Sequence, residues 1–354
     1  MRTRWSDPAH EYTDRNLKRL ERKIRAIYGQ AIAEVDAEIE DYFRRFEIKD
    51  EKWRQWVKDG KKTKAEYRYW LNGQIAVGEE WEKKREHLAN IYANADKAAY
   101  AVVYDHIPLV FAENINYATY QIEKAAKIDT AFTLYNSEAV ERILQQNPEM
   151  LPPAGKKVSA DIRAGRAVKW NVEQIQSVMM QGIIQGKSVM KIAASLASTV
   201  GDRDMKAAIR NARTMTTAAE NAGRVVGMQR AQDMGIELQQ QWMATLDNRT
   251  RHSHRMMDGE RVDVGKTFSN GCRFPADPYG APAEVYNCRC TLVAAVKGHQ
   301  INAQDLGLRN TDHMEQQSYS AWKHSHKITS NPIELPAIIA AIQKGRYIRE
   351  YKTL

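Results

Sequence analysis

The chain has 354 residues, three cysteines and a formal net charge of +9, from 53 Lys and Arg against 44 Asp and Glu. This length predicts roughly two to three domains, whose hydrophobic cores are large enough to be stable without disulfide bonds. A hydrophobic fraction of 43% and a charged fraction of 27% exclude collagen, a disulfide-dense scaffold and a wholly disordered chain. The modest basic excess permits a polyanionic partner without requiring one.

No run of about 18 apolar residues occurs, so a membrane-spanning helix is not expected. The first residues, MRTRWSDPAHEYTDRNLKRLERK, are basic but no apolar core follows them, which argues against a secretory signal. An odd number of cysteines without such a signal indicates a reducing compartment, with thiols that are free or metal-bound. All three cysteines lie in one short stretch, at Cys272, Cys288 and Cys290.

The first half of the sequence is predicted to form long helices. Between Asp14 and Phe46, apolar residues recur at steps of three and four, which gives one apolar helix face, and Thr13 or Asp14 is expected to cap its start. The opposite face is basic and carries Arg15, Lys18, Arg19, Arg22, Lys23 and Arg25. Such a face is usually only solvated, but it is also a candidate contact surface for DNA or an acidic partner.

Residues 49–85 interleave Trp and Tyr with Lys, a composition that can bind nucleotides. The helical spacing of Trp53, Trp56 and Trp70 instead favours packing within a helical hairpin that turns at 59–62. A third helix is predicted over 82–127, with a kink or break after Ile107 because Pro108 follows.

The best linker candidate is QNPEMLPPAG at 146–155. Beyond it, Asn171 and Gln174 suggest a capping box at the start of a helix. The run from Gly182 to Ser188 resembles a phosphate loop, but three residues separate its glycines where the loop needs four, and a helix precedes it. Nucleotide binding is therefore not expected, and Gly186 and Ser188 are predicted to end one helix and cap the next.

A further helix is predicted around 204–234. Its Arg213 and Arg224 are candidates either for phosphate contact or for ion pairs with Glu220 and Asp233 across helical turns. Beyond this helix, apolar residues recur at every second position instead of every third or fourth. This alternation predicts strands at 238–246 and 292–296. Helix starts are expected near 319–327 and 333–342.

The stretch from Trp242 to Thr291 permits three chemical interpretations. A zinc site would draw on the soft donors His252, His254, Cys272, Cys288 and Cys290, although structural zinc ligands usually come in pairs two to four residues apart. A hydrolytic or nuclease centre would use His254 as base with Asp247, Asp258 or Asp263 as metal ligands, but nothing in the sequence fixes their geometry. A structural role needs only turn-forming polar residues, a buried histidine and small buried thiols.

The pattern W-x-A-x-x-D-x-R-T-R-x-x-H-x-x-x-D-G, followed by P and N-C-R-C, resembles the Mu F-like domain of tailed-phage minor head proteins, the phage head-morphogenesis family. The resemblance covers roughly 165–297, somewhat over a third of the chain. It is carried by Trp242, Asp247, Arg249, Thr250, Arg251, His254, Asp258, Gly259, Pro282, Asn287, Cys288, Arg289 and Cys290. Cys272 departs from the family, which has an apolar residue there, and this departure weakens the zinc interpretation.

The chain is therefore predicted to be α+β and predominantly α-helical. We expect a helical N-terminal arm over 1–147, a Pro-rich linker over 148–155, a Mu F-like head-morphogenesis domain over 156–298 and a C-terminal helical tail over 299–354. The resemblance implies no demonstrated active site. We expect Asp247, His254 and Asn287 to hold the fold rather than to catalyse a reaction, and we expect no cofactor. Some toxins carry the domain fused to a separate enzyme, but the N-terminal half shows no such catalytic pattern.

The resemblance also implies a low-copy minor capsid protein of a virion, at the head interior or the portal vertex, and in the bacterial cytoplasm during assembly. The expected partner is the portal protein, with scaffold, major capsid protein and packaged DNA as further candidates, and no membrane. A DNA-binding ejection protein and a metal-dependent nuclease are the alternatives. Candidate contacts for DNA or a partner are the basic face at 15–25 with Arg213, Arg224, Arg249 and Arg251.

Overall fold

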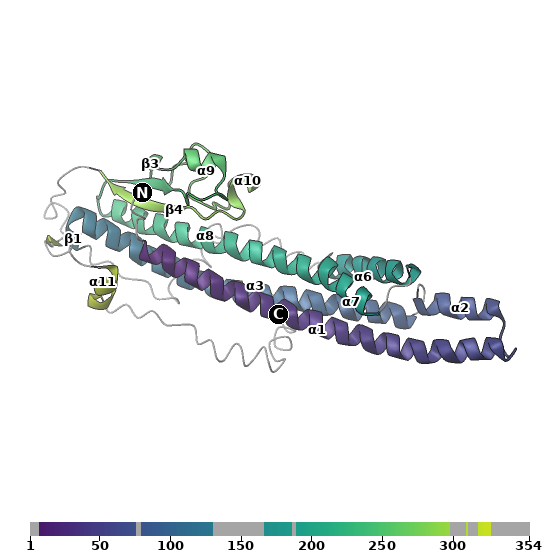
Figure 1. The fold of residues 1–354 in the computed structure, drawn as a ribbon. Coiled ribbons are helices and arrows are strands. Elements are labelled where there is room, and N and C mark those ends of the chain that lie inside the picture. Colours follow the sequence, from purple (N-terminus) through teal and green to yellow (C-terminus); the bar gives the residue numbers. More distant parts are fainter. Residues whose placement is uncertain are drawn as a thin grey trace. The chain divides into compact units, whose positions relative to one another are not determined.

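The computed structural model describes residues 7–75, 79–129, 166–185, 189–297, 309–310 and 318–326. These residues form two compact units, drawn in Figure 1. Unit 1 contains 7–21, 102–129, 210–297, 309–310 and 318–326, and unit 2 contains 22–75, 79–101, 166–185 and 189–209. The predicted domain boundaries near 147, 155 and 298 lie outside the described residues and stay predictions.

Helix α1 (Pro8–Lys58) begins earlier than predicted. Asp7 caps it, because its Oδ1 accepts a hydrogen bond from the backbone N–H of His10 at 2.9 Å, while Pro8 has no N–H that needs a partner. The predicted cap at Thr13 or Asp14 is wrong, since Thr13 lies inside the helix and its hydroxyl donates to the Ala9 carbonyl at 2.9 Å. The predicted apolar face is confirmed, with buried Leu20, Ile24, Ile27, Tyr28, Ala31, Val35, Ile39 and Phe43.

The predicted helical hairpin is confirmed in unit 2, where α1 turns into α2 (Lys64–Ile75). Thr63 and Glu66 form a capping box: the Glu66 N–H donates to Thr63 Oγ1 at 3.1 Å, and the Thr63 N–H donates to Glu66 Oε2 at 2.8 Å. Trp70 stacks on Phe46 and Trp53, with ring centroids 5.9 and 5.3 Å away. These aromatic rings therefore pack the hairpin.

Helix α3 (Glu79–Ala126) continues through Pro108, so the predicted break after Ile107 is wrong. A proline removes one backbone hydrogen bond from a helix. Its neighbours Ile107, Val110 and Phe111 are all buried, at 1%, 0% and 0% exposed. Burial of these side chains offsets the lost bond and keeps the helix continuous.

Two further helices complete unit 2, α6 (Arg166–Ile184) and α7 (Val189–Leu196), and a π-helical turn at Ala197–Gly201 leads on into α8. The predicted capping box is wrong because Asn171 lies buried inside α6. Gly182 also lies inside α6, where an added Cβ would come 2.5 Å from Cγ1 of Ile192 in α7. Close helix packing thus accounts for this glycine, whereas 186–188 lie outside the described residues.

Unit 1 contains a three-stranded antiparallel sheet beside helix α8 (Asp202–Asp233), as Figure 1 shows. The central strand β2 (Leu238–Met243) pairs with β3 (Arg261–Asp263) and β4 (Thr291–Val296). Leu238, Gln240 and Trp242 are the buried side of β2, as a period of two requires. The strands are confirmed near the predicted positions, and the fold is predominantly helical α+β.

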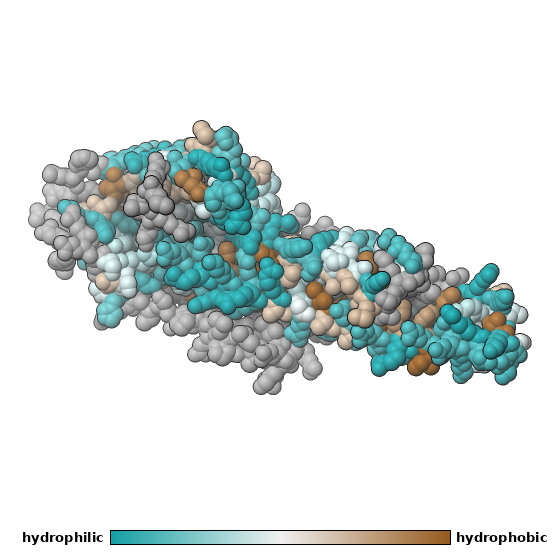
Figure 2. Space-filling model, in the orientation of Figure 1, coloured by the Kyte–Doolittle hydropathy of each residue, from teal (hydrophilic) through white to brown (hydrophobic). Residues whose placement is uncertain are grey.

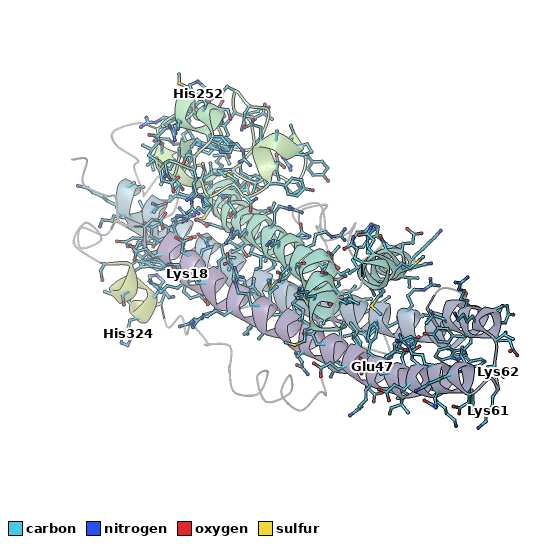
Figure 3. All side chains as sticks on the ribbon, turned by 45° about the vertical axis from the view of Figure 1, so that its right-hand side comes forward. Lys18, Glu47, Lys61, Lys62, His252 and His324 are labelled. Carbon is cyan, nitrogen blue, oxygen red and sulfur yellow. The ribbon has the colours of Figure 1, made fainter. Side chains whose placement is uncertain are left out.

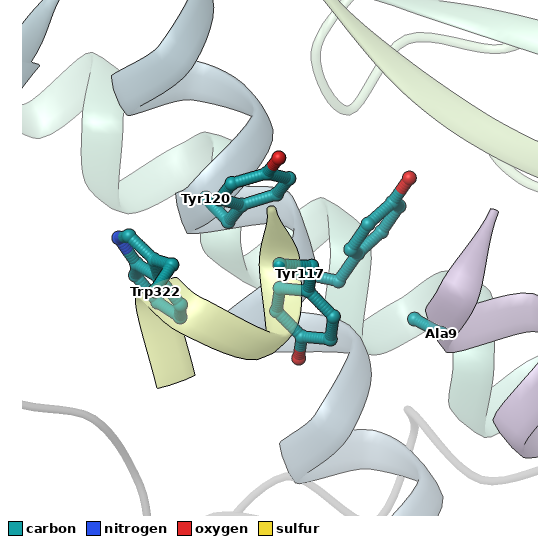
Figure 4. Close-up of a cluster of buried hydrophobic side chains, with 5 residues drawn as sticks. Ala9, Tyr117, Tyr120 and Trp322 are labelled. Carbon is teal, nitrogen blue, oxygen red and sulfur yellow. The ribbon is translucent and has the colours of Figure 1, made fainter. Parts of the chain in front are cut away.

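A cluster of aromatic rings attaches helix α11 (Tyr319–Ser325) to α3 in unit 1 (Figure 4). Tyr319 lies 5.0 Å from Tyr117, centroid to centroid, and Trp322 lies 5.8 Å from Tyr120. The indole N–H of Trp322 donates to Oε2 of Glu123 at 2.6 Å. Nearby, β1 (Ile128–Asp129) pairs with β5 (Arg309–Asn310). The helix predicted at 319–327 is confirmed, and 333–342 lies outside the described residues.

Hydrophilic residues dominate the face drawn in Figure 2, and hydrophobic ones are scattered among them. The largest exposed fractions of big apolar side chains belong to Tyr69 at 85%, Met190 at 78% and Met256 at 73%. Within the described residues, every helix is too short or too polar to serve as a membrane span.

Helices α3 and α8 approach each other closely in unit 1 because α8 carries glycines on the facing side. A Cβ added to Gly223 would come 2.5 Å from the backbone oxygen of Phe111, and one added to Gly227 would come 2.9 Å from Cβ of Ala118. Backbone atoms cannot move away as a flexible side chain can, so a larger residue at 223 must separate the helices.

We expect Gly223→Ala to lower the free energy of unfolding by about 1–3 kcal/mol through overpacking. Gly29→Ala is the matched control, because this exposed glycine of α1 has nothing within 4 Å of an added Cβ. There the change should raise stability by about 0.5–1 kcal/mol through helix propensity. Urea denaturation followed by circular dichroism checks both, and a Gly223→Ala protein as stable as the wild type would contradict the close approach.

Candidate functional site

A buried arginine lies at the centre of unit 1. Arg224 of α8 is 0% exposed, and its NH1 and NH2 donate to Oδ2 and Oδ1 of Asp7 at 2.7 and 3.0 Å. Its Nε donates to Oδ1 of Asn114 at 2.9 Å, and NH1 also donates to the carbonyl of Leu292 at 2.8 Å. One side chain thus joins the cap of α1, the middle of α3 and strand β4 to α8.

A carboxylate one turn earlier on α8 extends this network. Oε1 of Glu220 lies 3.4 Å from NH2 of Arg224 and accepts a hydrogen bond from the Thr291 hydroxyl at 2.8 Å. It also lies 2.8 Å from Nδ1 of His10. The charge of Glu220 outweighs burial and raises the pKa of His10 from 6.5 to about 9. His10 is therefore protonated, and hence charged, at neutral pH.

The residues after β2 form the first half of the sequence motif. Trp242 is 0% exposed, and its ring lies edge-on to those of His254 and Phe268, each 5.2 Å away between centroids. Asp258 closes the connection to β3 by accepting a hydrogen bond from the Ala244 N–H at 3.0 Å. Gly259 has φ +87°, which a tight turn there requires. These contacts fit the predicted structural role.

Asp247 and Arg289 join the two halves of the motif. NH1 and NH2 of Arg289 donate to Oδ2 and Oδ1 of Asp247 at 2.5 and 2.7 Å, a bidentate pair. Asp247 Oδ1 also accepts from the backbone N–H of Arg249 at 2.9 Å. The Arg289 hydrogen bonds, and then that backbone N–H, hold the pKa of Asp247 well below its usual range. Asp247 is therefore an ionised turn residue that fixes the loop before α9 (His252–Met256).

His254, Cys288 and Cys290 meet in the interior of unit 1 and are 2%, 1% and 2% exposed. Nδ1 of His254 lies 3.7 Å from Sγ of Cys288 and 3.4 Å from Sγ of Cys290. On the other side of the ring, Nε2 lies 2.9 Å from Oε2 of Glu284 in the short helix α10 (Pro282–Val285). The ring thus has two thiols on one edge and a carboxylate on the other.

The two thiols share a proton unequally. The hydrogen bond from Cys288, and then the contact with His254, overcome burial and lower the pKa of Cys290 to about 5. The neighbouring sulfur of Cys290 and burial raise the pKa of Cys288 well above its ordinary value. Within this coupled pair, deprotonation is therefore favoured at Cys290 over Cys288.

Helix α8 holds the N-C-R-C segment through its backbone. The hydroxyl of Thr217 donates to the Cys288 carbonyl at 2.8 Å, and Nδ2 of Asn221 donates to the Cys290 carbonyl at 3.2 Å. Asn287 has φ +57°, a left-handed conformation that asparagine tolerates. Thr217 and Asn221 were not predicted as site residues, although their spacing places them on one helical face with Arg224.

The structure does not assemble the other predicted ligands at this place. Among the described residues, the donor atoms that gather within 4.8 Å of one another are those of His254, Cys288 and Cys290, and those of a second group, Glu123, Asp129 and His326. His252 is exposed on α9, as Figure 3 shows, and buried Cys272 belongs to neither group.

The carboxylates of the nuclease interpretation are engaged elsewhere. Asp247 pairs with Arg289, and Asp258 accepts from the Ala244 N–H. Oδ1 of Asp263 lies 2.7 Å from Nζ of Lys297. None of the three belongs to a donor group that includes His254 among the described residues. The geometry therefore gives no support to a hydrolytic centre.

The predicted DNA or partner contacts have different environments. Arg224 is a correction, because a guanidinium that is fully buried and bound to Asp7 cannot reach an external phosphate. Nε of Arg213 lies 2.6 Å from Oε1 of Glu21, and Arg251 donates to the Tyr286 carbonyl. The exposed members are Arg15, Lys18, Arg19, Arg22, Arg25 and Arg249, with Lys23 half-buried, and Figure 3 labels Lys18 on α1.

Comparison with known proteins identifies similar chains. Residues 173–293, which include α8 and the whole N-C-R-C segment, match the family model described as phage Mu protein F like protein. The chain is 21% identical over 332 residues to the minor head protein GP7 of Bacillus phage SPP1, an alignment that covers 90% of this chain and 96% of that protein.

A second relative is an enzyme. The chain is 29% identical over 184 residues to the NAD(+)–arginine ADP-ribosyltransferase EFV of Enterococcus faecalis. This alignment covers 51% of the chain but only 36% of the enzyme, so the chain spans about a third of that relative's length. No solved structure matches the chain.

The His10–Glu220 pair should make the stability of unit 1 depend on pH. Because folding raises the pKa of His10 to about 9, its contribution is fully present below pH 6.5 and is lost as pH rises through 9. We expect His10→Gln to cost on the order of 2 kcal/mol at pH 6 and little at pH 9.5. Urea denaturation at both pH values measures this, with exposed His252→Gln as control. An equal loss at both values would show that the charge is not responsible.

Proposed function

We propose that this chain, whose residues 173–293 belong to the phage Mu protein F-like family, is a minor head protein of a tailed bacteriophage that acts in head morphogenesis. The observation that carries the proposal is the alignment with the minor head protein of phage SPP1, which extends over 96% of that protein. The likeness therefore includes the long helices that precede the Mu F-like segment as well as the segment itself.

The contacts of the motif residues support a structural role for this segment. Asp247, Arg289 and Asp258 are bound to other groups of the fold, and the N-C-R-C backbone is held by α8. The partial alignment with the ADP-ribosyltransferase is what a shared domain would produce, because most of that enzyme's length has no counterpart in the alignment. We therefore assign no transferase activity to this chain.

The finer assignment is that the protein is present in few copies, binds the portal protein, and acts in procapsid assembly or in DNA delivery. It would then lie in the virion, at the portal vertex or inside the head, after assembly in the bacterial cytoplasm. Scaffold and major capsid protein are further candidate partners. The support for this assignment is the family likeness.

We expect the full chain to copurify with the portal protein of its own phage. The test is co-expression of an affinity-tagged chain with untagged portal, followed by affinity capture and size-exclusion chromatography. A portal from an unrelated phage serves as the control and should stay in the flow-through. Failure to bind either the cognate portal or procapsids would reject the portal-vertex assignment.

Contact with packaged DNA is a second proposal, and the basic face of α1 supports it. Lys18 and Arg22 are exposed and one helical turn apart. Exposed cations in such a row can neutralise successive phosphates, and the resulting affinity falls steeply as salt rises. The face gives DNA a contact that needs no recognition of sequence.

We expect Lys18→Glu with Arg22→Glu to weaken duplex DNA binding roughly tenfold at low salt, because two phosphate contacts become repulsive. The matched control is Lys49→Glu with Lys58→Glu, which makes the same change of charge at exposed positions of the same helix. Filter binding across a salt series measures both. If the wild type retains no DNA at low salt, or if both double variants lose affinity equally, the basic face is not a DNA contact.

A further inference from the structure

Three soft donor atoms converge beside Trp242, and the function proposed above does not use them. They are Nδ1 of His254 and Sγ of Cys288 and Cys290, all within 4.8 Å of one another. We propose that these three residues bind a zinc ion, which would link helix α9 to the segment that directly precedes β4. The inference concerns the chemistry of the folded domain and is independent of whether the protein binds a portal.

The distances fit the coordination of one ion. Zinc bonds to sulfur and nitrogen are about 2.3 and 2.05 Å long, so tetrahedral geometry separates the two donor atoms by about 3.6 Å. The observed distances from Nδ1 of His254 are 3.4 Å to Sγ of Cys290 and 3.7 Å to Sγ of Cys288. Both separations are within about 0.2 Å of the tetrahedral value, and the three donor atoms lie within 4.8 Å of one another.

The far side of the histidine ring faces a carboxylate within ion-pair distance, although Nε2 makes no hydrogen bond of normal geometry there. A metal-bound histidine usually directs its other ring N–H at a carboxylate, which fixes the ring orientation. Here Nε2 lies 2.9 Å from Oε2 of Glu284. Glu284 in turn accepts a hydrogen bond from the Ser253 hydroxyl at 3.0 Å and lies 3.4 Å from Nδ2 of Asn270. This leaves Nδ1 as the nitrogen that faces the thiols.

The thiols are also held in place by contacts that do not involve the metal. Thr217 and Asn221 of α8 bind the carbonyls of Cys288 and Cys290 at 2.8 and 3.2 Å. Ligands whose backbone is fixed in this way lose little conformational freedom when they bind an ion. The positions of α8 and of the sulfur atoms are therefore coupled.

The donor set selects the class of metal. Two sulfurs and one imidazole are the soft to borderline ligands that suit zinc, whereas magnesium and calcium prefer oxygen. Three protein ligands leave a fourth position for water. Because each ligand is at most 2% exposed, a substrate has no open access to the ion. Burial of the donors therefore assigns the ion a role in holding the fold, although common structural zinc sites have a fourth protein ligand. His254 lies 34 and 36 residues from Cys288 and Cys290 along the chain.

The experiment measures the zinc content of the full chain, purified from zinc-supplemented cells through a tag that carries no histidine and without chelator. We expect inductively coupled plasma mass spectrometry to find about one zinc per wild-type chain. We expect almost none in Cys288→Ser or Cys290→Ser. Cys272→Ser is the matched control, since Cys272 is buried in the same unit but lies outside the donor group, and it should keep its zinc. Circular dichroism establishes that each variant is folded.

Two further measurements keep the test decisive when a serine variant does not fold. Chelation of zinc from the wild type should lower the melting temperature, and zinc but not magnesium should restore it. Cobalt substitution should give a thiolate-to-metal charge-transfer band. A folded wild type without zinc after supplementation, a disulfide between Cys288 and Cys290 in that protein, or equal loss of zinc in Cys272→Ser would overturn the proposal.

Discussion

The buried ion pair between Arg224 and Asp7 is the constraint on which unit 1 depends. A guanidinium with no solvent exposure must have all of its charge and donors satisfied within the protein. Asp7, Asn114 and the Leu292 carbonyl accept its hydrogen bonds. The geometry of these bonds therefore restricts the position of each acceptor. Loss of one partner from such a buried pair costs about 3–5 kcal/mol, because the other charge is left without compensation.

Helix α8, which precedes the sequence motif, also takes part in holding it. Glu220 and Arg224 on α8 bind β4 and the N-terminus of α1, and Thr217 and Asn221 on the same helix bind the N-C-R-C backbone. The N-C-R-C segment and strand β4 are thus positioned against one face of α8. The side chains of this helical segment therefore serve to fix main-chain geometry.

Local pattern predicted much of the fold. The apolar period located α1, the hairpin and the strands, because those signals depend on neighbouring residues. The start of α1 was missed because the Asp7–Pro8 cap precedes the first apolar repeat, and the effect of Pro108 was missed because the packing of Phe111 and Val110 is tertiary. In both cases the information lies in contacts that a window of sequence does not contain.

The same limit applies to the site. For Arg224 the sequence offers a DNA or partner contact or an ion pair with Glu220, and only the ion pair forms. Its partner Asp7 is 217 residues away, so no periodicity connects the two. The spacing of the cysteines argued against a metal because the rule describes ligands on one tight turn. His254 reaches Cys288 and Cys290 only in the folded protein, because 34 and 36 residues of chain separate them. The turn role predicted for Asp247 involves a local hydrogen bond from the Arg249 N–H, whereas its ion pair with Arg289, 42 residues away, was not predicted.

The sequence distances within the Arg224 network have a consequence for synthesis. Asp7 is among the first described residues of the chain, whereas Leu292 follows it by 285 positions. The ribosome therefore completes α1 and α3 long before this last partner of Arg224 exists. Unit 1 closes only when β4 has left the exit tunnel. A chain truncated before that point has both halves of the charge pair but lacks the carbonyl that completes their burial.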